Sequence, residues 1–200
     1  MPPTGTVRLP PPRFEGPLAV EEVLLARRSV RTFSRDPLTV DELTQLLWAA
    51  QGITHPQGYR TAPSAGALYP LELYVAVGRM VGLPAGFYRY RGREHALEVI
   101  GDRDLRPELG AAALHQRPVE RAPVVFLITA VYGRMTAKYG ERGVRYVDME
   151  AGHAAQNLCL QAAALDLKSV VIGAFQDLPL KRIAVLPAPE EPLYLVPVGK

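Results

Sequence analysis

Two arginines and a serine near the start of the chain have the types and spacing of an anion site. Arg27, Ser29 and Arg31 are two residues apart, so an extended backbone would place all three side chains on one face. The oxygens of a phosphate monoester suit this set, because each guanidinium can donate two parallel hydrogen bonds. The same residues could instead form a solvated helix end that complements the helix dipole, and the residues alone leave both interpretations open.

Two stretches of small residues would let the backbone approach a flat or charged ligand. The first is a polar connection that contains Pro63, Ser64, Ala65 and Gly66. Its amides are unencumbered by large side chains, which favours contact with a ligand. The second follows residues 169–172, an apolar run typical of an interior strand, and consists of Gly173 and Ala174. Each stretch is a plausible ligand seat, and neither defines a function.

Histidine and cysteine chemistry is not indicated by the sequence. The histidines (His55, His95, His115 and His153) lack the spacing of metal ligands, so we expect no metal site. His153 lies in a mostly apolar helix and is expected to be a hydrogen-bonded core residue. The single cysteine, Cys159, lies in the same helix and is expected to be a buried structural thiol.

The central element of the predicted fold is a buried helix from Tyr146 to Leu165, with apolar and small residues on all sides. One polar seam on it is formed by Glu150, His153, Asn157 and Gln161. Further helices are predicted at 18–27, 39–52, 104–116, 133–140 and 177–186, and strands at 71–77, 87–90, 96–100, 122–131, 169–172 and 192–198. This order indicates an α+β fold without the regular alternation of a doubly wound sheet.

Length and composition indicate one domain. The chain has 200 residues, of which 48% are hydrophobic, and we expect a domain at 18–200 after an extended, proline-rich arm at 1–17. A net charge of +3 is too small to indicate nucleic-acid binding. No apolar run has the length of a membrane span and the N-terminus lacks a signal peptide, so a cytoplasmic protein without membrane partners is expected. The glycine fingerprints of Rossmann and P-loop nucleotide sites are absent from the sequence.

Four motifs in order resemble the nitroreductase-like flavoproteins, and within them the SagB-type dehydrogenase, or azoline oxidase, branch. They are RRSVR at 27–31, PSAGALYP at 63–70, GHAAQNLCLQAAALDL followed by VVIGAF at 152–175, and a basic residue at position 200. The resemblance extends over residues 18–200. It implies an α+β fold with a mainly antiparallel central sheet flanked by helices, and FMN bound in a homodimer with a shared core.

The resemblance also implies cofactor contacts. The residues concerned are Arg27, Arg28, Ser29, Arg31 and Lys200 at the FMN phosphate, Pro63, Ser64, Ala65 and Gly66 reaching the flavin from the second subunit, and Gly173 and Ala174 at the isoalloxazine ring. Backbone amides near the flavin stabilise the electron density that arrives on reduction. Some relatives carry an acidic residue before the glycine at the end of the core strand. This chain has Gly173 and Ala174 there, so only a backbone contribution is expected.

A lysine and a tyrosine ahead of the long helix mark the SagB-type branch, and Lys138 and Tyr139 match them. Azoline oxidation requires proton loss at carbon while hydride passes to flavin N5, so a base is needed beside the flavin. The resemblance implies that a partly desolvated Lys138 is this base, with Tyr139 as donor or relay. Without the resemblance, the two residues would be a surface lysine and a packing aromatic.

Three functions remain open at this point. The first is oxidation of a thiazoline or oxazoline in a peptide to the azole. The second is NAD(P)H-dependent reduction of nitroaromatics or quinones, acting on a small-molecule substrate. Both would use FMN in a homodimer and exchange substrates in one pocket, which predicts ping-pong kinetics. The third is a non-catalytic flavin-binding or redox-sensing protein.

Overall fold

Seven strands form one central sheet in the computed structural model, which describes residues 5–200. Their bounds are β1 Thr6–Arg8, β3 Leu71–Val77, β5 Gly86–Arg91, β6 Ala96–Gly101, β7 Val124–Val131, β8 Lys168–Ser169 and β9 Glu190–Gly199. The strand order is β1-β6-β5-β3-β7-β9-β8, and each neighbouring pair is antiparallel. Outside this sheet, β2 (Leu38–Thr39) and β4 (Met80–Val81) pair in parallel.

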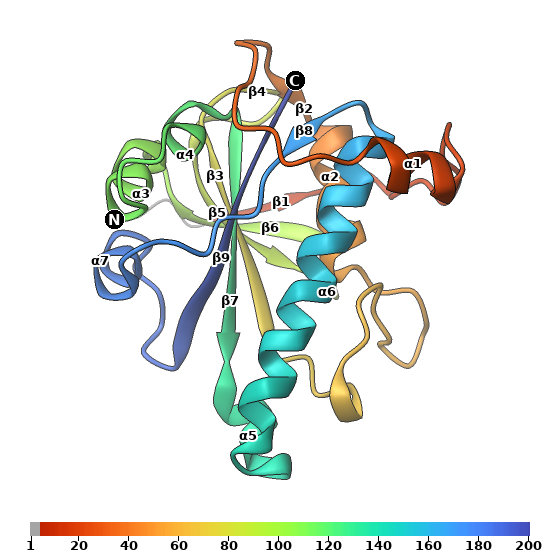
Figure 1. Cartoon of the computed structure of the whole chain (residues 1–200), viewed down its shortest axis with the longest axis vertical. Helices are drawn as coiled ribbons and strands as arrows, with labels where there is room; N and C mark the ends of the chain where they lie inside the picture. The colour runs from red at the N-terminus through yellow and green to blue at the C-terminus, as the bar shows by residue number, and fades with distance from the viewer. Residues whose placement is uncertain (1–4) are drawn as a thin grey trace.

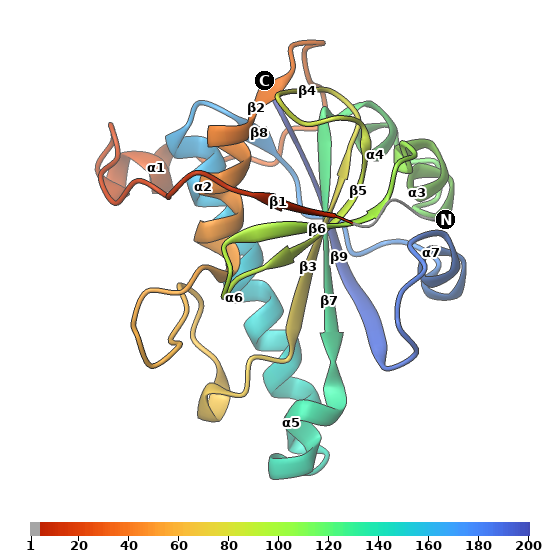
Figure 2. The ribbon, with the colours of Figure 1, turned by 180° about the vertical axis from the view of Figure 1, so that it is seen from behind.

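Helices cover both faces of the sheet. Their bounds are α1 Val20–Ala26, α2 Val40–Gln51, the short 3-10 helix η1 Ala65–Ala67, α3 Arg106–Ala112, α4 Arg117–Arg121, α5 Tyr132–Tyr139, α6 Arg142–Ala164 and α7 Asp177–Ile183. Figures 1 and 2 show α2 and α6 side by side on one face, and α3, α4 and α7 on the other. The predicted α+β class, with a mainly antiparallel sheet flanked by helices, is confirmed.

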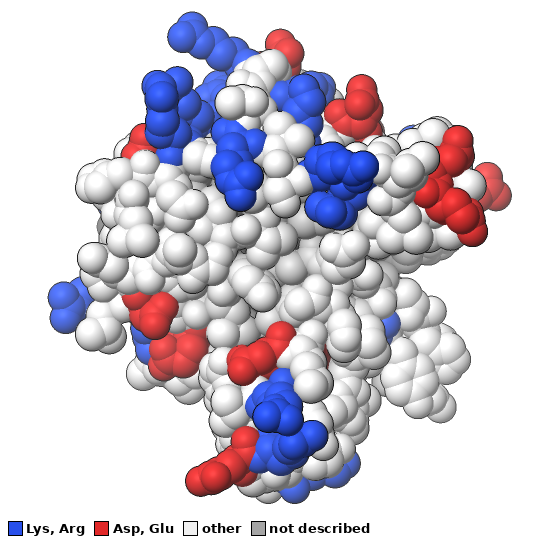
Figure 3. Space-filling view, viewed as in Figure 1, with Lys and Arg blue, Asp and Glu red and all other residues white. Residues whose placement is uncertain are grey.

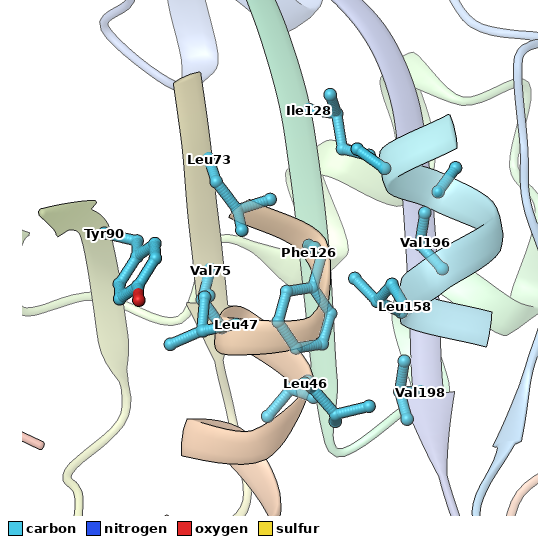
Figure 4. Packing of buried hydrophobic residues seen from close by; sticks show 14 of the residues in the cluster. Leu46, Leu47, Leu73, Val75, Tyr90, Phe126, Ile128, Leu158, Val196 and Val198 are labelled. Carbon is cyan, nitrogen blue, oxygen red and sulfur yellow. The ribbon is translucent and has the colours of Figure 1, made fainter. Parts of the chain in front are cut away.

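The strand β7 lies in the interior of the sheet, between β3 and β9, as its apolar run predicts. On one face Phe126 and Ile128 pack against Leu47 of α2 and Leu158 of α6 (Figure 4), and all four are at most 1% exposed. Burying a side chain of this size contributes about 1.5–3 kcal/mol. This packing fixes α6, and with it the residues at its two ends, against the sheet.

The capping box predicted at the start of α2 is confirmed. Thr39 Oγ1 accepts a hydrogen bond from the Glu42 amide at 3.2 Å, and Glu42 Oε2 accepts one from the Thr39 amide at 2.7 Å. Two amides that the helix cannot satisfy internally are thereby paired. The helix ends at Gln51, directly before Gly52, as predicted.

The apolar run at 169–172 is not an interior strand, so that prediction is wrong. The strand β8 lies at the edge of the sheet and ends at Ser169, and Ile172 forms an isolated bridge with Leu195. The side chains of Val170 and Ile172 are nevertheless buried, in the core shared with α3, α4 and α7. Burial by helices therefore accounts for an apolar pattern that would also fit an interior strand.

The helix predicted at 104–116 is shorter in the structure. It ends at Ala112, and Leu114 and His115 both adopt a positive φ of 58° before α4 begins. A left-handed backbone cannot continue an α-helix. Pro118 in the first turn of α4 suits the start of a second, separate helix.

The long helix α6 begins at Arg142 rather than Tyr146, and the prediction that it is buried on all sides is wrong for the single chain. Met149 is 50% exposed, and His153 and Gln156 are also exposed. An added Cβ at Gly152 would meet no atom within 4 Å. One face of α6 is therefore exposed to solvent in the single chain. Within residues 5–200, no helix combines the length and the apolar character that a bilayer span requires.

Three residues of the predicted polar seam on α6 face their own chain. Asn157 Nδ2 donates to the Thr61 carbonyl at 3.2 Å, Gln161 Oε1 lies 3.4 Å from Gln45 Nε2 of α2, and Glu150 is buried. His153 does not share this environment. It is exposed, so the expectation of a hydrogen-bonded core histidine is wrong.

The proline-rich arm contains the strand β1, which the sequence pattern does not predict, and β1 pairs with β6. Gln45 accepts a hydrogen bond from the Arg13 amide and donates one to the Arg13 carbonyl, both at 2.9 Å. The ring centroids of Phe14 and Trp48 are 5.6 Å apart. The described part of the arm therefore lies along its own chain, while residues 1–4 fall outside the described residues.

Candidate functional site

The residues predicted to hold a phosphate lie beside β8, at the end of the molecule where Lys and Arg side chains gather in Figure 3. Ser29 forms a parallel bridge with Ser169, and the Val30 amide donates to the Ser169 carbonyl at 2.9 Å. Arg27 is half-buried and Arg31 is exposed. Among residues 5–200, neither arginine has a carboxylate within ion-pair distance.

Arg28 differs from its two neighbours. Its Nη1 donates to the carbonyls of Leu25 and Arg27, both at 2.8 Å. These are carbonyls at the C-terminal end of α1, where a positive charge complements the helix dipole. Arg28 therefore fits the alternative interpretation from the sequence, a positive charge at a helix end that complements the helix dipole.

Lys200 lies beside the segment that carries these arginines. Its carbonyl accepts a hydrogen bond from the Ser34 amide at 2.7 Å, and its Nζ is 3.5 Å from Glu42 Oε1. Because Gly199 pairs with Lys168, β9 delivers Lys200 to the same end of the sheet as β8. The structure thus brings Lys200 to the end of the molecule that carries Arg27, Ser29 and Arg31.

Gly173 and Ala174 are exposed, in the connection between β8 and α7. The Ala174 carbonyl accepts a hydrogen bond from Gln116 Nε2 at 2.9 Å. A Cβ at Gly173 would lie 3.6 Å from the ring of Tyr194, which is ordinary contact. The backbone here is held by a hydrogen bond and is exposed.

The loop Pro63–Gly66 lies at the other end of α6, against α5. Gly66 has a φ of 62°, and a Cβ there would lie 2.7 Å from the Tyr139 hydroxyl and 2.9 Å from Lys138 Nζ. The positive φ favours glycine, and a larger residue there would displace the ends of the Lys138 and Tyr139 side chains. The structure therefore brings the Lys138 and Tyr139 pair together with this loop within one chain.

Two residues that the sequence did not single out hold this loop in place. The Tyr69 amide donates to Ser64 Oγ at 2.9 Å, and Arg134 donates to the Tyr69 carbonyl at 3.1 Å. Arg134 also donates to Glu72 Oε1 at 2.6 Å, which ties α5 to β3. Both contacts of Arg134 join residues far apart in sequence, so no local motif could have signalled them.

Lys138 is exposed on α5, with Nζ 5.3 Å from the centroid of the Tyr139 ring. Tyr139 is half-buried, and its ring meets that of Tyr146 edge to face at a centroid distance of 5.2 Å. The partial desolvation expected of Lys138 is not found in the single chain. The side chain of Lys138 stays exposed although its Nζ lies near Gly66, whereas Met135 of the same helix is fully buried.

Glu150 is a buried carboxyl beside the loop, and it was noted from the sequence only as part of the polar seam. It is 2% exposed and lines a cavity of about 290 Å³. The other lining residues are Pro63, Ser64, Ala65, Tyr146, Met149 and His153. Burial raises the pKa of Glu150 to about 7, while the Ser64 hydroxyl and the Arg60 guanidinium act to lower it. Within residues 5–200, neither carboxylate oxygen has a partner with hydrogen-bond geometry, so Ser64 is near but not bonded.

The two groups of predicted site residues are separated by the length of α6. The arginines lie next to Ser169, beyond its C-terminal end, and Lys138 and Tyr139 precede its N-terminal end. A helix of 23 residues spans about 34 Å. In one chain, the residues predicted to hold the phosphate therefore lie far from Lys138 and Tyr139.

A family model described as the Nitroreductase family matches residues 24–200, from within α1 to Lys200. The chain belongs to the nitroreductase family. Proteins of this family are oxidoreductases. Between residues 5 and 200, no three His, Cys, Asp or Glu side chains are grouped closely enough to hold a metal ion.

Individual members and neighbours of the nitroreductase family are similar over most of the chain. A protein of Methanocaldococcus jannaschii named as a nitroreductase is 47% identical over 183 residues, which cover 92% of this chain and 91% of the relative. The crystal structure of a Ralstonia eutropha protein described as a nitroreductase has a TM-score of 0.85 and 31% identity, covering 100% of this chain and 92% of that one. A chain in the E. coli microcin synthetase McbBCD complex with truncated pro-MccB17 has a TM-score of 0.76 and 25% identity, covering 88% of this chain and 69% of that one.

Proposed function

We propose that this nitroreductase-family protein is an FMN-dependent oxidoreductase that works as a homodimer and oxidises azoline rings in the SagB-type manner. The observation that carries the proposal is the contact of Lys138 and Tyr139 with Gly66. It puts the residue pair that marks the azoline-oxidising branch beside the loop predicted to touch the flavin. Similarity to a chain of the microcin synthetase complex supports this choice within the family.

The residues at the basic end fit the phosphate of FMN. Arg27 and Arg31 have no carboxylate partner among the described residues, so their donors are available to an anion. Lys200, which follows β9, brings an ammonium that would be shared between Glu42 and the phosphate, and Ser29 brings a hydroxyl. When bound, FMN would supply a ring that accepts hydride at N5.

A homodimer would join the two separated groups of residues. If the bare faces of two α6 helices pack antiparallel, the loop and Lys138 of one chain come to the basic end of the other. The exposed face of α6, with Met149, Gly152 and Gln156, offers a surface of small and flexible side chains for this contact. The same packing would cover Lys138 and thereby desolvate it.

In azoline oxidation, one ring carbon loses a proton and the neighbouring carbon loses a hydride to the cofactor. Lys138, covered by the second subunit, would accept the proton as an uncharged amine, because a base must be uncharged to do so. Tyr139, whose hydroxyl is held against Gly66, would orient the substrate by a hydrogen bond or pass the proton on. Exchange of the azoline and the electron acceptor in one pocket gives ping-pong kinetics, with parallel initial-rate lines.

Replacement of Lys138 by Ala is expected to lower turnover of a thiazoline-containing peptide by about 10²–10⁴-fold, the usual contribution of a general base. The FMN content of the purified protein should not change, because Arg27, Ser29 and Arg31, which are proposed to hold the phosphate, are all kept. Lys138→Arg is the matched variant: it keeps the charge but cannot act as a base, and it should be equally inactive. Unchanged turnover in Lys138→Ala would remove this residue from the mechanism.

Anaerobic mixing separates azoline oxidation from its alternatives in the same protein. Loss of the oxidised flavin absorbance on adding a thiazoline peptide, but not on adding NAD(P)H, is the expected result. Rapid bleaching by NAD(P)H alone would instead favour a reductase of nitroaromatics or quinones. A bound flavin that neither compound reduces would identify a non-catalytic flavin protein.

A further inference from the structure

The carboxyl of Glu150 is buried beneath the loop Pro63–Gly66 without a hydrogen-bond partner among residues 5–200. An ionised carboxylate in this place would have neither a counter-ion nor a hydrogen-bond donor from the described residues, which is costly. The neighbouring cavity of about 290 Å³ separates part of the loop from α6, so the loop has room to change its position relative to the helix.

The cation nearest to Glu150 is engaged elsewhere. Arg60 Nη1 donates to Gln51 Oε1 at 2.7 Å, and the Arg60 guanidinium lies 4.6 Å from the centroid of the Tyr69 ring. Arg60 acts on Glu150 from beyond ion-pair distance. The other titratable groups around the loop are His153 and Tyr146, which line the cavity from α6, and Lys138 and Tyr139, which meet Gly66 from α5.

Ser64 is the link between Glu150 and the loop. Its Oγ accepts a hydrogen bond from the Tyr69 amide at 2.9 Å, and its carbonyl accepts one from the Ala67 amide at 3.0 Å. Because the Oγ already acts as an acceptor, its hydrogen is free to turn toward a carboxyl in the floor of the cavity. Glu150 lies near Ser64 without a hydrogen bond to it, so a change of charge on Glu150 acts electrostatically on the residue that shapes the loop.

We propose that Glu150 is a positioning residue: its protonated carboxyl lets Pro63–Gly66 close against α6 and against Lys138 and Tyr139, and loss of the proton opens the loop. This rests on the proposed function only in giving the loop a role at the flavin. Closing of the loop Pro63–Gly66, which is proposed to reach the cofactor of the second subunit, is then coupled to proton uptake by Glu150 of its own chain. Glu150 itself need not touch substrate or cofactor.

The pH window follows from the raised pKa of Glu150, about 7 in the closed loop against an ordinary value of 4.5 once water reaches the carboxyl. Below the lower value the carboxyl is protonated whether the loop is closed or open, and the closed loop has its full stability. Between the two values closing requires proton uptake, so the opening equilibrium rises by up to about tenfold per pH unit. Above the higher value the carboxyl is ionised in both states, and the opening equilibrium no longer changes with pH.

Hydrogen exchange of the full-length protein without FMN tests the inference. The amides of Ala67 and Tyr69, which bond to Ser64, are followed from about pH 5 to pH 8, and each rate is divided by the intrinsic rate at that pH. In the wild type, the resulting opening equilibrium should rise by about tenfold to a hundredfold up to pH 7 and then level off. In Glu150→Gln, which keeps the shape without the charge, it should be flat.

Two controls sharpen this experiment. Glu141→Gln, at an exposed carboxylate just before α6, should keep the wild-type profile, and the Thr54 amide, bonded to the Tyr59 carbonyl, should show no such rise in any variant. A wild-type profile that is flat between pH 5 and 7, or a rise that persists in Glu150→Gln, would overturn the proposal. Because FMN is absent from the assay, failure of the proposed function would be seen separately, as failure to bind FMN at any pH.

Discussion

Gly152→Glu is expected to leave the chain folded while abolishing both the homodimer and FMN binding. In the single chain a Cβ at Gly152 meets nothing within 4 Å, and glutamate is the better helix former, so the fold should be stabilised by up to about 1 kcal/mol. Packing of two α6 faces would bury the added carboxylate without a partner, at a cost of about 3–5 kcal/mol per site. The dimer should therefore weaken by at least about a hundredfold.

Light scattering of the eluted protein, with the flavin absorbance of the same peak, measures this directly. Leu178→Glu is the matched control, because it also adds a carboxylate to an exposed helix position, 65% exposed on α7, but on the opposite face of the sheet. It should stay dimeric and yellow. A Gly152→Glu protein that is dimeric and carries FMN would show that α6 is not the interface.

The double variant Arg27→Ala, Arg31→Ala is expected to weaken FMN binding by about a hundredfold or more. Each hydrogen bond from a charged donor contributes about 1.5–3 kcal/mol, and the two side chains are free to meet one phosphate. Arg28→Ala should have a much smaller effect, because its guanidinium already donates to the carbonyls at the end of α1. Fluorescence titration of the FMN-free protein gives the three dissociation constants.

Arg103→Ala serves as the control for lost positive charge in this series. Arg103 is 72% exposed at its side chain, pairs with Glu108, and lies between β6 and α3, the helix that packs on the face of the sheet opposite α6. Its FMN affinity should equal that of the wild type. Equal affinities for the wild type and the double variant would place the phosphate elsewhere.

Local signals in the sequence were sufficient for the parts of the fold that depend on neighbouring residues. The Thr39 and Glu42 pair specifies a helix start by itself, and the apolar run ending at Val131 has the character of a central strand. In the same way, the short spacing of Arg27, Ser29 and Arg31 sufficed to suggest an anion site. Their assignment to FMN stays a prediction.

Other features could not be predicted, because they depend on contacts across the fold. An apolar run at 169–172 is buried equally well by an interior strand or by helices packed on a sheet edge, and the structure has the second arrangement. An apolar, small-residue helix face is the same in sequence whether it faces a core or a second subunit, so α6 was expected to be buried. The approach of Gly66 to Tyr139, and the isolation of Glu150 below it, arise only when the chain is folded.

The central claim is that this nitroreductase-family protein binds FMN in a site that two chains complete. Its most direct test is the mass and the flavin content of the purified wild-type protein, measured on one chromatographic peak. The prediction is a yellow dimer that releases FMN in equal number to its chains on denaturation. A colourless protein that added FMN cannot reconstitute, or a monomer that holds FMN, would contradict the account.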